Sequence, residues 1–196
     1  MTEARYNIER DLSEAKTMAD NLLPYVYENE LYGNIGGGST PKLTIGGLLL
    51  RLHRLHTLAD RLNANQKATL ERIDAQHEEV RREWSIHYHE KLKQEAFSRL
   101  KVIEAFFVEC EDDPRACSNN YQPEANRRTI VQNIVEALGS SDGSADVAQA
   151  AKKIDARLRR FTEPSDFVWS SELQPAYPPD KYWWLYAKPP RFPSKG

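Results

Sequence analysis

The sequence has few of the features that mark secreted, membrane-spanning or nucleic-acid-binding proteins. Only two of its 196 residues are cysteine, which excludes a disulfide-rich scaffold, and two thiols with no histidine after them do not make a structural zinc site. Uninterrupted apolar runs are short, as at residues 45–50, whereas a membrane span requires about 20 apolar residues. The net charge is −2, and no segment has the sustained positive excess that phosphate binding requires, so nucleic-acid binding is not predicted.

No signal peptide is predicted from the first residues, because charges alternate along them and no basic stretch precedes an apolar core. We therefore expect a cytoplasmic protein. In a reducing compartment Cys110 and Cys117 are expected to be free thiols. They flank an acidic turn, residues 111–114, so a local disulfide between them is geometrically feasible as the alternative.

Glycine and proline are both absent between residues 48 and 113, which predicts a long helical region. Its apolar positions recur with alternating spacings of three and four residues, the pattern of one helix face. The stripe consists of Leu48, Leu52, Leu55, Ala59 and Leu62, then Leu70, Ile73, His77, Val80, Trp84 and His87, and then Leu92, Ala96, Leu100, Ile103 and Phe107. Asn65 is suited to cap a new helix. Residues 43–110 therefore form either one rod or an antiparallel hairpin broken near residues 63–66, and both alternatives stay open.

The same periodicity predicts three further helices, at about residues 4–32, 123–138 and 145–161. The first should kink or restart at Pro24, and Pro123 suits the first turn of the second. Gly139 suits a left-handed cap, and Ser144 can cap the last helix. Glycine-rich residues 33–41 predict a flexible linker, because the lysine of a phosphate-binding loop is missing.

The last 34 residues, 163–196, differ in composition, since seven are proline and eight are aromatic. Proline at this density excludes a regular helix and favours an extended arm. Tryptophan and tyrosine are over-represented among interface hot spots. The candidate partner-binding residues are Trp169, Tyr182, Trp183, Trp184 and Tyr186. Three destinations stay open for this arm: its own helices, another subunit or partner, and a lipid interface.

Histidines beside the leucine stripe offer a candidate metal site. His53, His56 and Asp60 lie at positions i, i+3 and i+7, and in a hairpin His53 would approach His77. The glutamate-rich pattern of di-iron bundles is absent. We interpret the histidines as surface groups that flank the stripe, and predict neither a metal nor a cofactor.

An arginine is followed five residues later by a histidine at Arg51/His56, Arg72/His77 and Arg82/His87. This spacing resembles the Arg-x4-His element of the all-helical HEPN ribonucleases, and Glu83 supplies the polar second residue that this family often shows. The resemblance implies a ribonuclease in which arginine and histidine act on an RNA phosphate, usually across a dimer.

These patterns together predict an all-α protein: a helical bundle or long antiparallel coiled coil over residues 1–162, with a proline- and aromatic-rich extended C-terminal arm over residues 163–196. No catalytic residue is predicted, because no serine lies in a strand-to-helix elbow and Cys110 lies between two acidic residues. The expected function is a non-catalytic interaction or assembly subunit that binds a protein partner or forms a homodimer. A HEPN-like ribonuclease and a metal-binding helical bundle are the alternatives.

Overall fold

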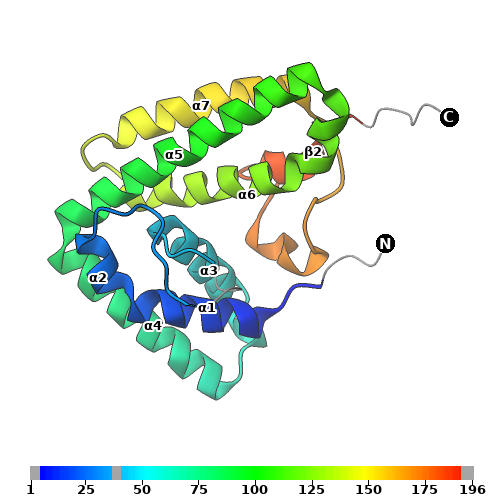
Figure 1. Ribbon diagram of the computed structural model, residues 1–196. Coiled ribbons are helices and arrows are strands. Elements are labelled where there is room, and N and C mark those ends of the chain that lie inside the picture. Colours follow the sequence, from blue (N-terminus) through cyan, green and yellow to red (C-terminus); the bar gives the residue numbers. More distant parts are fainter. Residues whose placement is uncertain (1–4, 37–40, 191–196) are drawn as a thin grey trace. The chain divides into compact units, whose positions relative to one another are not determined.

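The computed structural model describes residues 5–36 and 41–190, leaving aside the side chains of residues 114–116. It is all-α, as the spacing of the apolar residues predicts (Figure 1). The chain divides into two compact units, one formed by residues 6–95 and one formed by the residues from 96 onward together with Arg5. We call them the N-terminal unit and the C-terminal unit. The proline- and aromatic-rich segment after residue 162 packs on α6 and belongs to the same unit as α6.

The N-terminal unit contains four helices and the first part of a fifth. These are α1 (Ile8–Asp20), α2 (Leu22–Tyr27), α3 (Ile45–Thr57), α4 (Ala64–Glu83) and the beginning of α5 (Ser85–Asp112), with a short 3-10 helix, η1 (Ala59–Arg61). The chain breaks at Asn21 and restarts with Pro24 in the first turn of α2, which is one of the two alternatives expected there. Helix α1 packs against α3 and α4.

The predicted long region, residues 43–110, is interrupted twice. The first break separates α3 from α4, so the continuous rod is excluded, and His56 pairs with Asp74 across the break. The cap of α4 is Asn63 rather than Asn65, because Asn63 and Gln66 exchange side-chain and backbone hydrogen bonds in a capping box. The second break, at Trp84, was not predicted.

The glycine-rich connector is closed at its base by two backbone hydrogen bonds. Gly33 donates to Leu43 over 3.0 Å and accepts from it over 2.8 Å. A Cβ atom on Gly33 would lie 2.9 Å from the ring of Tyr25, so this position requires glycine. Residues 37–40 of the predicted linker lie outside the described residues.

Charged side chains join α1 to α3 in the N-terminal unit. The Arg51 guanidinium donates two hydrogen bonds, of 2.9 and 2.6 Å, to the Glu14 carboxylate, and Arg54 pairs with Asp11 at 3.5 Å. Burial alone would raise the pKa of Glu14, but hydrogen bonds from Arg10 and Arg51 outweigh it and hold this pKa below its usual value. Leu48, Leu52 and Leu55 of the predicted apolar stripe are buried on the same helix, α3.

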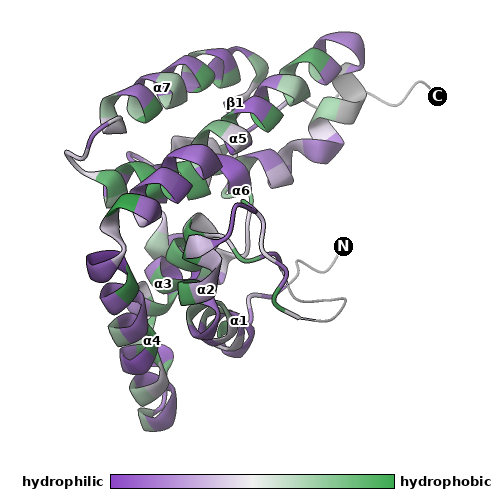
Figure 2. Cartoon of the chain, turned by 60° about the vertical axis from the view of Figure 1, so that its left-hand side comes forward, coloured by the Kyte–Doolittle hydropathy of each residue, from purple (hydrophilic) through white to green (hydrophobic). Residues whose placement is uncertain are grey.

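The C-terminal unit contains the rest of α5 and two further helices, α6 (Pro114–Leu138) and α7 (Ser144–Phe161). They are followed by β1 (Glu163–Pro164), η2 (Ser171–Ala176), η3 (Trp183–Tyr186) and β2 (Ala187–Lys188), and β1 pairs with β2 in antiparallel fashion. Helices α6 and α7 pack as a hairpin, and α7 alternates hydrophilic and hydrophobic patches along its length (Figure 2).

Three local expectations in this hairpin have different outcomes. Gly139 does adopt the left-handed conformation, with a φ of 52°. Helix α6 begins at Pro114 instead of near Pro123, and proline is well suited to the first position of a helix. Pro123 therefore lies inside the helix. Ser144 does not cap α7, since the cap position is Gly143 with a φ of 76° and no side-chain hydrogen bond.

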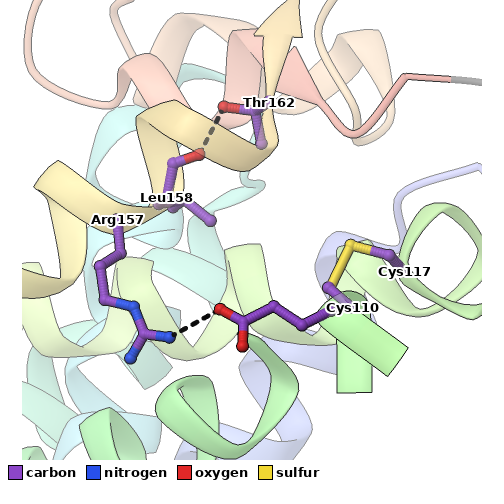
Figure 3. Close-up of a disulfide and its surroundings, with 6 residues drawn as sticks. Cys110, Cys117, Arg157, Leu158 and Thr162 are labelled. Atoms are coloured by element: carbon purple, nitrogen blue, oxygen red, sulfur yellow. Dashed lines mark hydrogen bonds and ion pairs between the residues drawn. A yellow bond between two sulfur atoms is a disulfide. The ribbon is translucent and has the colours of Figure 1, made fainter. Parts of the chain in front are cut away.

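The expectation of free thiols is wrong in this structure. Cys110 and Cys117 form a disulfide between the end of α5 and the start of α6, and both residues are buried (Figure 3). Because α6 follows α5 after a single residue, the Cα atoms come within 4.8 Å, a separation that a disulfide spans readily. Nearby, Arg157 of α7 contacts Glu111 of α5 at 3.5 Å.

No helix in the described ranges combines the length and apolar character that crossing a bilayer requires.

Candidate partner-binding groove

Trp184 fixes the aromatic segment to α6. It is 1% exposed, its indole N–H donates to the Thr129 hydroxyl over 2.9 Å, and its carbonyl accepts a hydrogen bond of 2.7 Å from the Tyr121 hydroxyl. The Arg128 guanidinium lies 4.0 Å from the ring centroid and also forms two hydrogen bonds to Asp155 on α7. The indole N–H and the carbonyl of Trp184 are therefore both satisfied inside the unit, as burial of an indole requires.

A row of edge-to-face aromatic rings continues from Trp184. Tyr182 lies 5.6 Å from Trp184, Tyr177 lies 5.0 Å from Tyr182, and Trp169 lies 5.1 Å from Tyr177, measured between ring centroids. Tyr182 and Tyr177 are fully buried. Two of the five predicted partner-binding residues, Tyr182 and Trp184, thus belong to the core of the unit. Aromatic composition alone did not distinguish them from rings that remain accessible.

The other three predicted residues, Trp169, Trp183 and Tyr186, are partly exposed. Trp183 and Tyr186 line one groove of about 320 Å³, whereas Trp169 does not. The groove is completed by residues from the end of α7, β1, the turn before η3 and β2: Arg159, Thr162, Glu163, Pro164, Pro179 and Ala187. Its volume falls at the lower end of the range of small-molecule pockets.

The base of the groove is held by backbone pairing. In the β1–β2 ladder Glu163 is opposite Lys188 and Pro164 is opposite Ala187. Further hydrogen bonds run from the Ser165 N–H to the Tyr186 carbonyl, at 2.8 Å, and from the Val168 N–H to the Leu185 carbonyl, at 2.9 Å. The segment after α7 is therefore tied to η3 on both sides of Tyr186.

Two of the groove's side chains are held in place by hydrogen bonds to backbone carbonyls. The Tyr186 hydroxyl donates to the Tyr177 carbonyl over 2.7 Å, and burial raises the pKa of this hydroxyl. Thr162 donates to the Leu158 carbonyl over 2.9 Å at the end of α7 (Figure 3). These bonds leave the Tyr186 ring and the Thr162 hydroxyl oxygen in fixed positions.

The remaining polar groups of the groove have no partner within the described residues. The Arg159 guanidinium lies 3.8 Å from the Trp183 ring centroid and makes no ion pair there. The Trp183 indole N–H takes part in no hydrogen bond among those residues, and the exposed Glu163 carboxylate is likewise unpaired. Hydrogen-bond donors and one carboxylate thus face a mostly apolar groove.

Sequence reasoning missed Arg159, Thr162 and Glu163. They occupy the last turn of α7 and the two positions after it, next to the segment that was treated as a separate arm. The sequence carries no signal that separates Trp183 from Trp184, since adjacent large side chains can both be buried, as Phe106 and Phe107 are.

The residues of the Arg-x4-His elements do not meet in one site in the N-terminal unit. Arg51 pairs with Glu14, His56 with Asp74, His77 with Tyr88 and Arg82 with Glu83. The His77 ring lies 2.7 Å from the Tyr88 hydroxyl, and burial lowers the pKa of His77.

The proposed metal ligands are also distributed differently from the expected set. Asp60 lies in η1 rather than on the helix that carries His53 and His56. In the part of the chain that the structure describes, no group of three histidine, cysteine, aspartate or glutamate residues is placed to hold a metal ion.

No family model, no curated protein and no solved structure matches this chain.

Proposed function

We propose that this protein is a non-catalytic interaction subunit that binds a protein partner through the groove lined by Trp183 and Tyr186. The proposal depends chiefly on Trp183, a partly exposed tryptophan with a guanidinium stacked on it and with no hydrogen-bond partner for its indole N–H within the described residues. Tryptophan, tyrosine and arginine are the residues most enriched among binding hot spots.

The surroundings of the groove support this proposal because they are held in place. Trp184, next to Trp183 in the chain, is anchored by Thr129, Tyr121 and Arg128. A binding surface on a fixed backbone loses little conformational entropy when a partner docks. One tryptophan of the pair thus holds the segment, and the other is presented to a partner.

Site-specific crosslinking tests this function directly. A photo-reactive amino acid placed at Thr162, inside the groove, is expected to capture a defined protein that mass spectrometry identifies at a reproducible peptide. The matched control carries the same amino acid at Lys101, an exposed position on α5. Capture that is equal at both positions, or absent from Thr162, contradicts the proposal.

The captured protein then allows an affinity measurement. We expect Trp183→Ala to weaken binding by at least about tenfold, because truncation of a hot-spot residue costs on the order of 2 kcal/mol. Trp169→Ala is a useful comparison, since Trp169 is also partly exposed but does not line the groove. Equal losses in the two variants would remove the groove from the proposal.

Self-association through a helix surface is a second part of the proposal. Three large apolar side chains on α5 are exposed in the C-terminal unit: Phe97 by 45%, Val102 by 41% and Val108 by 55%. Contact with a second copy of the chain would remove these side chains from water, which favours association. Sedimentation equilibrium of the full chain should show a dimer, and replacement of Phe97 by Lys should dissociate it. A monomer at every concentration tested contradicts this part.

The cytoplasmic location also remains a proposal, and the disulfide makes it testable. Persistent disulfides are rare in a reducing cytosol. Because both cysteines are buried, cells should be lysed directly into denaturant that contains an alkylating reagent. Mass measurement should then find Cys110 and Cys117 modified if the protein resides there. Unmodified, disulfide-bonded cysteines would indicate an oxidising compartment.

A further inference from the structure

We infer that the ligand of the groove is a proline-rich peptide segment in the polyproline II conformation, with one carboxylate side chain beside its prolines. This inference depends on the proposed function, since it names the class of partner that the same groove would bind.

The walls of the groove favour proline rings. Trp183 and Tyr186 supply aromatic surfaces, and Pro164 and Pro179 supply rigid apolar surfaces. Aromatic-lined grooves are the recurring binding sites for polyproline II segments, because such a segment is already extended and loses little entropy on docking.

The unused hydrogen-bonding groups favour the same ligand. Apart from Glu163, the groups without partners among the described residues are donors, namely the Trp183 indole N–H and the N–H groups of Arg159. A complementary ligand must therefore offer acceptors and bring few donors of its own. Consecutive prolines meet this requirement, since they have carbonyl groups but no backbone N–H.

The charge of Arg159 favours a carboxylate in the ligand. Stacking on Trp183 at 3.8 Å holds the guanidinium near the ring, and its N–H fork matches a carboxylate with two parallel hydrogen bonds. Glu163 is exposed in the same groove and repels further negative charge. The groove therefore favours a single acidic residue over an acidic run.

Isothermal titration of the full chain with blocked peptides tests the inference. The probe is acetyl-Pro-Pro-Glu-Pro-Pro-amide, and three matched peptides replace Glu by Gln, Glu by Lys, or every Pro by Ala. We expect the Glu peptide to bind at least about tenfold more tightly than each of the other three. The Gln and Lys peptides lose the charge-assisted pair with Arg159, and the alanine peptide loses the preformed conformation.

Two variants assign the contacts. Arg159→Gln should abolish the preference for Glu over Gln, and Trp183→Phe, which keeps a ring but removes the N–H, should weaken every proline peptide several-fold. Trp169→Phe and Lys101→Gln are the controls and should leave all affinities unchanged. Circular dichroism of each variant establishes that the fold is retained.

Several results would overturn the inference. These are the absence of binding by the Glu peptide, equal binding of the all-alanine peptide, tighter binding of the Lys peptide, and affinities that Arg159→Gln and Trp183→Phe leave unchanged. If crosslinking from Thr162 still captures a partner that binds by another kind of segment, only the ligand class is wrong. If that crosslinking fails as well, the proposed function is wrong.

Discussion

In the N-terminal unit, charged side chains connect the helices, whereas in the C-terminal unit aromatic rings connect the final segment to its helices. Glu14 and Arg51 join α1 to α3, and the fully buried Glu95 carboxylate accepts a hydrogen bond of 2.8 Å from the Gly46 N–H at the start of α3. In the C-terminal unit Trp184 and Tyr182 are the corresponding buried side chains.

This difference determines how each unit should respond to mutation. When a mutation removes one partner of a buried ion pair, the other charge stays buried and unpaired. The stability lost then depends on the desolvation of that charge. When a mutation removes a buried ring, it leaves a cavity, and the stability lost depends on the volume of that cavity. The contact between α1 and α3 should therefore be sensitive to changes of charge, and the packing of the final segment on α6 to changes of side-chain size.

The largest effect is expected for Trp184→Ala. Loss of a buried tryptophan costs about 3–5 kcal/mol, and here the Thr129 hydroxyl and the Arg128 guanidinium also lose contacts. Urea unfolding of the full chain measures the change. Trp183→Ala, at the neighbouring and partly exposed position, should cost about 1 kcal/mol or less. Similar losses for the two tryptophans would contradict the assigned difference in their roles.

A smaller effect is expected for Arg51→Met in the N-terminal unit. It removes both hydrogen bonds to Glu14 and leaves that carboxylate without its partner on α3, which should cost about 2–3 kcal/mol in urea unfolding. The matched control is Lys16→Met, which breaks an exposed pair with Asp20 and should cost at most about 0.5 kcal/mol. If both variants lose the same stability, ion pairing is not what joins α1 to α3.

Removal of the disulfide should have a comparable or slightly smaller effect. The cross-link closes a short loop, for which the chain-entropy model gives about 2 kcal/mol. The Cys110→Ala/Cys117→Ala double variant should therefore unfold at lower urea concentration than the oxidised protein. Adding a reductant to the oxidised protein should produce the same shift, and no shift in either experiment would show that the cross-link does not constrain the unfolded chain.

The smallest effects concern pH, and they have opposite signs in the two units. Burial lowers the pKa of His77 from 6.5, so the unfolded chain binds a proton first and stability is lost as the pH falls below about 6.5. Burial raises the pKa of Glu124 from 4.5 to about 7, so the folded chain holds this proton more tightly than the unfolded chain does. The stability that Glu124 contributes is therefore present at low pH and is lost as the pH rises from about 4.5 to 7. Glu124 is paired with Arg127 through one oxygen, and within the described residues its other oxygen accepts no hydrogen bond.

Two variants separate the contributions of His77 and Glu124 to the pH dependence of stability. Between pH 7 and pH 5, the stability of His77→Gln relative to the wild type should rise, because this variant lacks the loss that His77 causes. Over the same range the stability of Glu124→Gln relative to the wild type should fall, because this variant lacks the gain that protonation of Glu124 supplies. Urea unfolding at several pH values measures both. Parallel curves for the wild type and either variant would show that the replaced group does not titrate differently on folding.

Much of the helical content was predictable because it depends on residues close together in the sequence. Leu48, Leu52 and Leu55 repeat with the period of a helix, and they are buried in α3. The left-handed Gly139 between α6 and α7 was predictable for the same reason.

Other local features were ambiguous because several choices satisfy the same pattern. Asn63 and Asn65 are both good caps, and the capping box with Gln66 selected Asn63. Pro114 and Pro123 both suit a first turn, and the helix begins at the earlier one. The break at Trp84 has no signal in the apolar spacing, which continues across it.

The amino-acid order thus determined that the chain is helical, where most apolar faces lie, and that its aromatic residues gather near the C-terminal end. Only tertiary structure decided which aromatic rings are buried and which line a groove. The reason is distance along the chain: Trp184 is held by Thr129, 55 residues away, and Trp183 meets Arg159 on another helix. Contacts of that kind are chosen by how whole helices pack, and no periodicity of three or four residues encodes them.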